Sequence, residues 1–158
     1  MPETTLQDHY ASAALRHHDD AVYLHEDGRL PNADHHYGFV AECAVKSLLI
    51  RNNLVSVEPH NRPWLPKQNG KPRFLGHFPS LQTDTEPMLA AAALQMHGRG
   101  GTILSGVISA WQPFADWSPE DRYLDGASVD PAQVSDRRAA AEQILSLHEQ
   151  ALIVGVLT

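Results

Sequence analysis

Apolar residues recur at helical spacing through much of the chain. Between Thr4 and Glu26 they fall three or four residues apart, which predicts a helix with one apolar face. That face comprises Tyr10, Ala14, His17, Ala21 and Leu24. Gly28 is placed to end this helix, because glycine adopts the left-handed capping conformation without steric cost.

A second helix is expected to begin near Pro31, since proline suits the first helical turn. Its apolar face comprises Ala33, Tyr37, Val40, Ala41, Ala44 and Leu48. Glu42 and Lys46 stand one turn apart with the acid first, the favourable order for an exposed ion pair.

From about residue 55 to residue 80 the helical pattern is lost. Five prolines in this stretch rule out a continuous helix, and Asn69-Gly70 indicates a turn. We therefore expect a long irregular Pro-rich loop. Five cations between Arg51 and Arg73 face the single acid Glu58, a local charge of +4. This basic segment could bind an anion or an acidic partner, or simply be a solvated loop.

Helical patterns return after this loop. Thr83 followed by Glu86 is a capping-box pattern that predicts a helix start. Gly98, Gly100 and Gly101 should break that helix before an apolar segment from Thr102 to Trp111. Further starts are expected at Ser118-Pro119 and Asp130-Pro131, where a capping side chain precedes a first-turn proline. The last helix would bury Val134, Ala141, Leu145, His148 and Leu152.

Together these elements predict an all-α fold, an antiparallel bundle of four to five helices. With 158 residues, the chain fits a single domain covering residues 1–158. Apolar faces on several helices of so small a bundle also make a homodimer plausible.

Composition restricts the classes of function. The net charge of −7 argues against general nucleic-acid binding through an all-basic surface. No membrane span or secretory signal is apparent, and the single cysteine, Cys43, fits a reducing cytoplasm. We therefore expect a cytoplasmic protein.

Ten histidines invite a search for metal sites. His25-Glu26 and His148-Glu149 lack the second histidine of a zinc protease helix, and no glutamate has a histidine three residues on. A site built from histidines of separate helices stays open, but we assign no metal ligand and no cofactor. Cys43 lies on a helix with core character, where cysteine behaves as a small apolar residue.

Four segments in order resemble domains of the HEPN superfamily. The stretch Asn32–Leu49, with Ala41-Glu42 followed by Ala44 and Lys46, is similar to the second helix of those domains. The other three are the preceding helix up to Gly28, the segment Gly76–Leu81 and the segment Trp117–Tyr123. The resemblance implies an antiparallel helical bundle that is frequently dimeric. It also implies association with nucleotidyltransferases or toxin–antitoxin pairs, and roles in RNA cleavage and in defence against phage.

Members of that family that cleave RNA carry an arginine followed by a histidine after four to six residues. Here only Arg29 with His35 or His36 has that spacing, and the pair precedes the second helix rather than lying at the later position that the nucleases use. If the chain is a nuclease, a histidine would act as general acid or base and the arginine would stabilise the charged phosphorane.

The resemblance also marks residues that could bind a ligand. These are Glu42, Lys46, His77, Arg122 and Tyr123. Each has a structural alternative: Glu42 and Lys46 could bridge helices, His77 could cap the helix ahead of Leu81, and Arg122 could pair with Asp20 while Tyr123 packs.

Three functions follow as hypotheses. The leading one is a HEPN-like module that binds RNA or a nucleotide, as a homodimer or with a partner such as a nucleotidyltransferase or an antitoxin. The second is a metal-independent ribonuclease using Arg29 with His35 or His36. The third is a metal-binding helical bundle.

Overall fold

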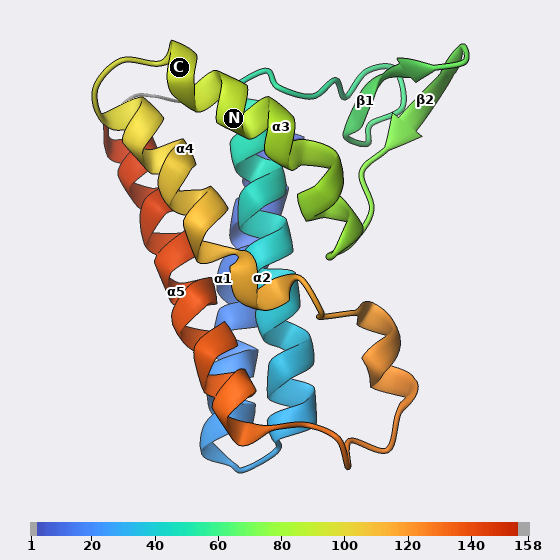
Figure 1. Cartoon of the computed structure of the whole chain (residues 1–158), viewed down its shortest axis with the longest axis vertical. Helices are drawn as coiled ribbons and strands as arrows, with labels where there is room; N and C mark the ends of the chain where they lie inside the picture. Colours follow the sequence, from blue (N-terminus) through green and yellow to red (C-terminus); the bar gives the residue numbers. More distant parts are fainter. Residues whose placement is uncertain (1–2, 155–158) are drawn as a thin grey trace.

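The chain is mostly helical, as expected (Figure 1). The structure, a computed structural model, describes residues 3–154. Within that range lie five α-helices: α1 (Leu6–Glu26), α2 (Leu30–Arg51), α3 (Ser80–Gln95), α4 (Arg99–Ala110) and α5 (Pro131–Ile153). Two short 3₁₀ helices, η1 (Gln112–Phe114) and η2 (Pro119–Tyr123), lie between α4 and α5, and two strands, β1 (Trp64–Gln68) and β2 (Lys71–Phe74), between α2 and α3.

The first two helices form a hairpin, and α2 is the central helix of the fold. Gly28 has a positive φ of 78° and its N–H donates to the carbonyl of His25, so the predicted end of the first helix is confirmed. α2 packs against both α1 and α5. All six residues of its predicted apolar face are buried, which confirms this helix as a core element.

α4 packs against α5, and α3 packs against α4 (Figure 1). The predicted helix start at Thr83 is wrong, because α3 begins at Ser80 and Thr83 Oγ1 instead donates to the carbonyl of Pro79 at 3.4 Å. The predicted glycine break is confirmed at Gly98, which has a φ of 70° and separates the end of α3 at Gln95 from the start of α4, whereas Gly100 and Gly101 lie in the first turn of α4. A Cβ atom on Gly101 would lie 2.6 Å from the carbonyl oxygen of Ala93, so glycine allows the two helices to approach.

We expected the segment 55–80 to be irregular, but part of it forms a hairpin of two strands. β1 and β2 form an antiparallel hairpin with Trp64 opposite Phe74, and Asn69-Gly70 makes the predicted turn with positive φ at both residues. Pro66 and Pro72 lie within these strands. A two-stranded ribbon has an unpaired side on each strand, so it tolerates prolines that a central strand would not.

The C-terminal part matches its sequence pattern closely. Ser118 and Asp130 accept backbone hydrogen bonds from Glu120 and Ala132, which confirms both predicted helix caps. Of the face predicted for the last helix, Val134, Ala141 and His148 are buried and Leu145 is partly buried. Leu152 is 44% exposed, so its predicted burial is wrong, because α5 turns its neighbour Ala151, which is 0% exposed, toward the core instead. Among residues 3–154 no helix has the length and apolar character needed to cross a bilayer.

Candidate functional site

Three histidines from three separate segments surround Phe39, and a fourth, His36, lies against two of them. We call His17, His35, His36 and His77 the histidine cluster. The centres of the His35, His17 and His77 rings lie 4.7, 5.4 and 5.8 Å from the centre of the Phe39 ring. α1 supplies His17, α2 supplies His35 and His36, and the segment ahead of α3 supplies His77. The fold thus collects imidazoles that lie up to 60 residues apart in the sequence.

His17 and His36 form the closest pair of the cluster. Their Nδ1 atoms lie 3.0 Å apart, so one ring must donate this hydrogen bond and the other accept it. Burial, the nearby His36 and then Arg16 lower the pKa of His17. At neutral pH this pair therefore contains an uncharged imidazole with both a donor and an acceptor nitrogen.

His35 contacts a second aromatic side chain, Trp117, in addition to Phe39. Its ring stacks on Trp117 with centres 6.1 Å apart, and Trp117 Nε1 donates to the carbonyl of Asp34 at 3.0 Å. The indole fits because residue 38 is glycine: a Cβ atom there would lie 1.9 Å from the Trp117 ring. Burial, His36 and Arg122 lower the pKa of His35.

Glu42 and Lys46 are not the exposed pair that their spacing suggested. Both side chains are buried, because α2 is covered on nearly all sides. Lys46 Nζ donates to Glu42 Oε1 at 2.7 Å, and His77 Nδ1 lies 2.8 Å from Glu42 Oε2. Both carboxylate oxygens therefore have partners. The His77 side chain bonds Glu42 rather than capping a helix, and only its backbone carbonyl accepts the N–H of Leu81.

The predicted arginines, Arg29 and Arg122, bond partners outside the histidine cluster. Arg29 Nε bonds Asp27 at 2.7 Å, and no hydrogen bond or ion pair joins it to His35 or His36. Arg122 donates to the hydroxyl of Tyr123 at 2.7 Å and lies over that ring. The predicted pairing of Arg122 with Asp20 and the predicted packing of Tyr123 are therefore wrong. Tyr123 is 71% exposed, because η2 carries it on its outer side.

A buried ionic network beneath the cluster was missed from the sequence. Arg137 on α5 donates to Asp34 Oδ2 at 2.6 Å, to Asp116 Oδ1 at 2.9 Å and to the carbonyl of Pro113 at 3.0 Å. Burial raises the pKa of Asp34, although the charge of Arg137 opposes it. The network joins α2 to α5 and to the segment after η1. Arg137 stands in the polar run Asp136-Arg137-Arg138, which gave no sign of burial.

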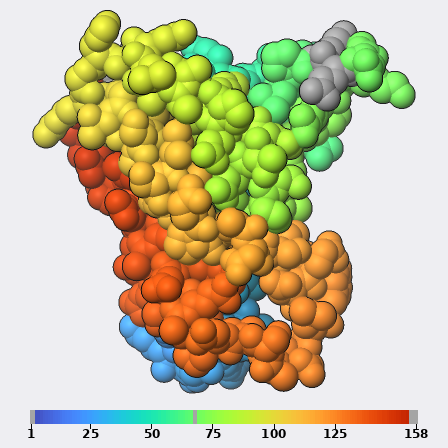
Figure 2. Space-filling model, viewed as in Figure 1, coloured from blue at the N-terminus to red at the C-terminus, as the bar shows by residue number. Residues whose placement is uncertain are grey.

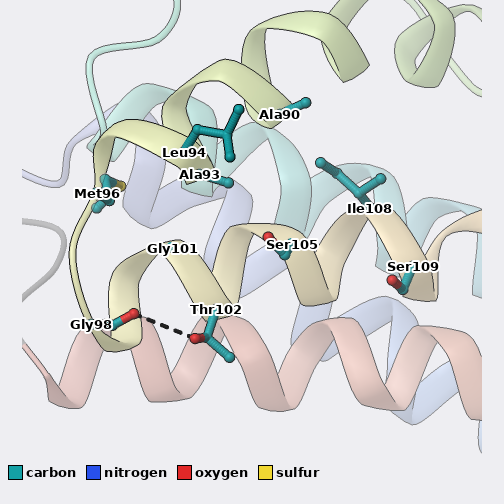
Figure 3. A pocket seen from close by; sticks show the side chains of 10 residues that line it. All are labelled: Ala90, Ala93, Leu94, Met96, Gly98, Gly101, Thr102, Ser105, Ile108 and Ser109. Carbon is teal, nitrogen blue, oxygen red and sulfur yellow. Dashed lines mark hydrogen bonds between the residues drawn. The ribbon is translucent and has the colours of Figure 1, made fainter.

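A surface groove between α3 and α4 offers no comparable chemistry. It has a volume of about 720 Å³ and is lined by small or apolar side chains such as Ala90, Ala93 and Ser105 (Figure 3). It contains no charged or titratable side chain. The histidine cluster is therefore the stronger candidate site.

The geometry supports neither a reactive thiol at Cys43 nor the hypothesis of a metal-binding bundle. Burial raises the pKa of Cys43 to about 12, so the thiol is not a nucleophile at neutral pH. Within residues 3–154, histidine, cysteine and carboxylate side chains nowhere form a group of three or more arranged to hold a metal ion. The cluster instead offers imidazole donors and an aromatic surface.

Comparison with known proteins gives no direct assignment. No protein-family model, no curated protein and no solved structure matches this chain. The resemblance to HEPN domains therefore rests on the sequence segments alone, and the function has to be argued from the histidine cluster.

Proposed function

We propose that the protein is a HEPN-like helical module that binds the phosphate groups of RNA or of a nucleotide at the histidine cluster. The observation that carries the proposal is the convergence of His17, His35 and His77 around the ring of Phe39, with His36 packed against His17 and His35. In the sequence these residues show no such relationship.

The chemistry of the cluster suits a phosphate ligand. Imidazoles donate hydrogen bonds to phosphate oxygens, and each gains a positive charge when it is protonated. Arg16 and Arg122 are near enough to lower the pKa values of His17 and His35, so they add positive potential here. The nearby Glu42 is already paired with Lys46 and His77, so its charge is balanced.

A nucleic-acid ligand also needs a surface for its bases. Phe39 is partly buried and is ringed by imidazoles, and the Trp117 ring meets it edge-on at 5.5 Å between centres. Stacking on aromatic side chains is the usual way in which single-stranded RNA is held without sequence readout. The cluster therefore combines the two contacts that such a ligand requires.

An RNA-binding assay tests this proposal. Fluorescence anisotropy of a labelled single-stranded RNA is measured at pH 6 and at roughly 50 mM salt, where electrostatic binding is strong. We expect His17→Ala/His36→Ala to weaken binding about tenfold, the loss of one charge-assisted contact. The matched control is His9→Ala/His97→Ala, which removes two exposed histidines outside the cluster. Equal affinity of the two double variants would refute the proposal.

The ribonuclease hypothesis remains the second candidate. The hydrogen-bonded His17–His36 pair favours it, because one imidazole can accept a proton while the other donates. Against it, Arg29 is engaged by Asp27. RNA cleavage by the wild type and by His35→Ala/His36→Ala decides the matter: unchanged cleavage removes these residues from the mechanism.

The resemblance further suggests a homodimer. Leu15 and Leu152 lie on either side of a groove of about 540 Å³ between α1 and α5, and they are 60% and 44% exposed. A two-fold dimer uses the same surface of both copies, so one such contact would cover four leucines. We propose this surface as the place where a second copy binds.

A further inference from the structure

A second polar site adjoins the histidine cluster at His35. It is a pocket of about 190 Å³ between the start of α2, the start of α5 and the segment of residues 121–129. In the space-filling view an opening is visible between the segment around residues 119–130 and the helices behind it (Figure 2). Its polar lining includes Asp34, His35, Asp116, Asp121 and Arg137.

Two buried atoms of this lining have no hydrogen-bond partner. They are Asp34 Oδ1 and His35 Nδ1. The Asp34 residue is only 5% exposed, and its other oxygen is already bonded to Arg137. A buried polar atom without a partner is unfavourable, and both of these atoms belong to residues of one pocket lining, so a ligand that donates to both would remove that cost.

The charge of the lining selects the kind of ligand. Three aspartates and one arginine give a formal charge of −2, and the arginine is occupied, because it donates to Asp34, Asp116 and Pro113. An anion would therefore meet three carboxylates and, within this lining, no cationic side chain other than the occupied Arg137. A metal ion would lack ligands, since the described residues supply no group of three. A cation with N–H groups can donate hydrogen bonds to the two unpartnered atoms, and its positive charge offsets the negative charge of the lining.

We propose that this pocket binds a small organic cation that carries N–H groups, an alkylammonium or a guanidinium compound. The ligand donates to Asp34 Oδ1 and to His35 Nδ1, the latter in its acceptor tautomer. The carboxylate of Asp121 at the rim adds attraction without a direct role in the fold, because its side chain is exposed. The pocket shares His35 with the histidine cluster, but Asp34 and Asp121 belong to the pocket alone, so Asp121→Asn tests this inference separately from phosphate binding.

Amide NMR spectra recorded during a titration test the proposal directly. Ethylammonium chloride and guanidinium chloride are the probes, and tetramethylammonium chloride, which has no N–H, and sodium chloride are the controls. We expect saturable shifts at the amides of Asp34 and His35 with at least one probe. The Trp117 indole N–H, which donates to the Asp34 carbonyl, should shift with them.

Two neighbouring carboxylates on η2 give a matched pair of variants. Asp121 lines the pocket and Glu120 does not. We expect Asp121→Asn to weaken probe binding about three- to tenfold and Glu120→Gln to leave it unchanged. The proposal is overturned if neither probe binds, if tetramethylammonium produces the same shifts, or if both variants weaken binding equally. The first result would mean that the pocket holds only water.

Discussion

His17 Nδ1 lies 3.0 Å from His36 Nδ1, a hydrogen bond that joins the first two helices within the histidine cluster. Only one proton can occupy this contact. A bound phosphate would compete with it by offering oxygens to both rings, and protonation of the second ring would then be favourable.

RNA binding should therefore depend on pH. The pKa of His17 lies below its usual value, so this ring is uncharged at pH 8 and gains charge as the pH falls toward 5. We expect affinity for single-stranded RNA to rise as the pH falls from 8 to 6, measured by anisotropy at constant salt. In His17→Ala/His36→Ala this rise should be much smaller. An affinity that is independent of pH in the wild type would contradict the role of the cluster.

Gly38 should be required for the packing of the Trp117 indole against α2. A Cβ atom at residue 38 would lie 1.9 Å from the indole ring, so Gly38→Ala forces Trp117 to move. We expect a loss of at least about 2 kcal/mol in the free energy of unfolding, measured by urea denaturation. Gly76→Ala is the control, because a Cβ at residue 76 meets no atom within 4 Å. Equal stability of the two variants would show that the Trp117 contact is misplaced.

The buried ion pair should make Arg137 far more important than its neighbour. Arg137→Met leaves Asp34 buried without its partner and should cost about 3–5 kcal/mol of stability. Removing the charge of both residues in Asp34→Asn/Arg137→Met should restore most of that loss. Arg138→Met breaks only a partly exposed pair with Glu142 and should change stability by less than about 1 kcal/mol.

An Arg137→Met variant as stable as Arg138→Met would contradict the network. Thermal unfolding of the three variants at one pH makes the comparison.

His148 should make stability fall in mild acid. Its Nε2 lies 2.9 Å from Ser47 Oγ, whose own proton goes to the carbonyl of Gln7. Burial, and then the charge of Arg51, lowers the pKa of His148 to about 4. In the unfolded chain it is about 6.5. Between these values the unfolded chain binds a proton that the folded chain does not, so stability decreases as the pH falls.

The size of this effect is about 3 kcal/mol between pH 6.5 and pH 4. His148→Gln keeps an N–H donor for Ser47 but does not titrate, so its stability should vary less with pH over this range. His97→Gln, at an exposed position, should keep the slope of the wild type. A wild-type slope in His148→Gln would mean that other groups cause the acid sensitivity.

The proposed dimer contact can be tested by placing a charge in it. Leu15→Glu should convert a dimer to a monomer, as measured by light scattering on a size-exclusion column. Leu94→Glu is the control, because Leu94 is 87% exposed on α3 and lies outside the α1–α5 groove. A wild type that is monomeric at every concentration would rule out the dimer.

The sequence predicted the elements that depend on local signals. Gly28, Ser118 and Asp130 end or begin helices as expected, because a cap depends only on residues within one turn. The hairpin after α2 was missed, since only its turn had a recognisable pattern and prolines such as Pro66 and Pro72 are uncommon within strands. The capping-box pattern at Thr83 failed because α3 already begins at Ser80.

The site depends on contacts between distant segments, which a single sequence does not reveal. His35, His36 and His77 were identified as candidates, but the approach of His36 to His17 follows from the packing of α1 on α2, and the segment ahead of α3 brings His77 to Phe39. In the sequence, Arg137 lies within the charged run Asp136-Arg137-Arg138, which is typical of a solvent-exposed helix face. Only the presence of Asp34 across the core, 103 positions away, makes it a buried partner.

The most direct test of phosphate binding is the titration of the imidazoles themselves. The ring protons of His17 and His36 are followed by NMR from pH 8 to pH 5, with and without a nucleoside monophosphate. A phosphate held by the pair stabilises the charged rings, so we predict that the nucleotide raises the pKa of at least one of them by about one unit, a tenfold linkage. Identical titration curves with and without nucleotide would contradict phosphate binding at the histidine cluster.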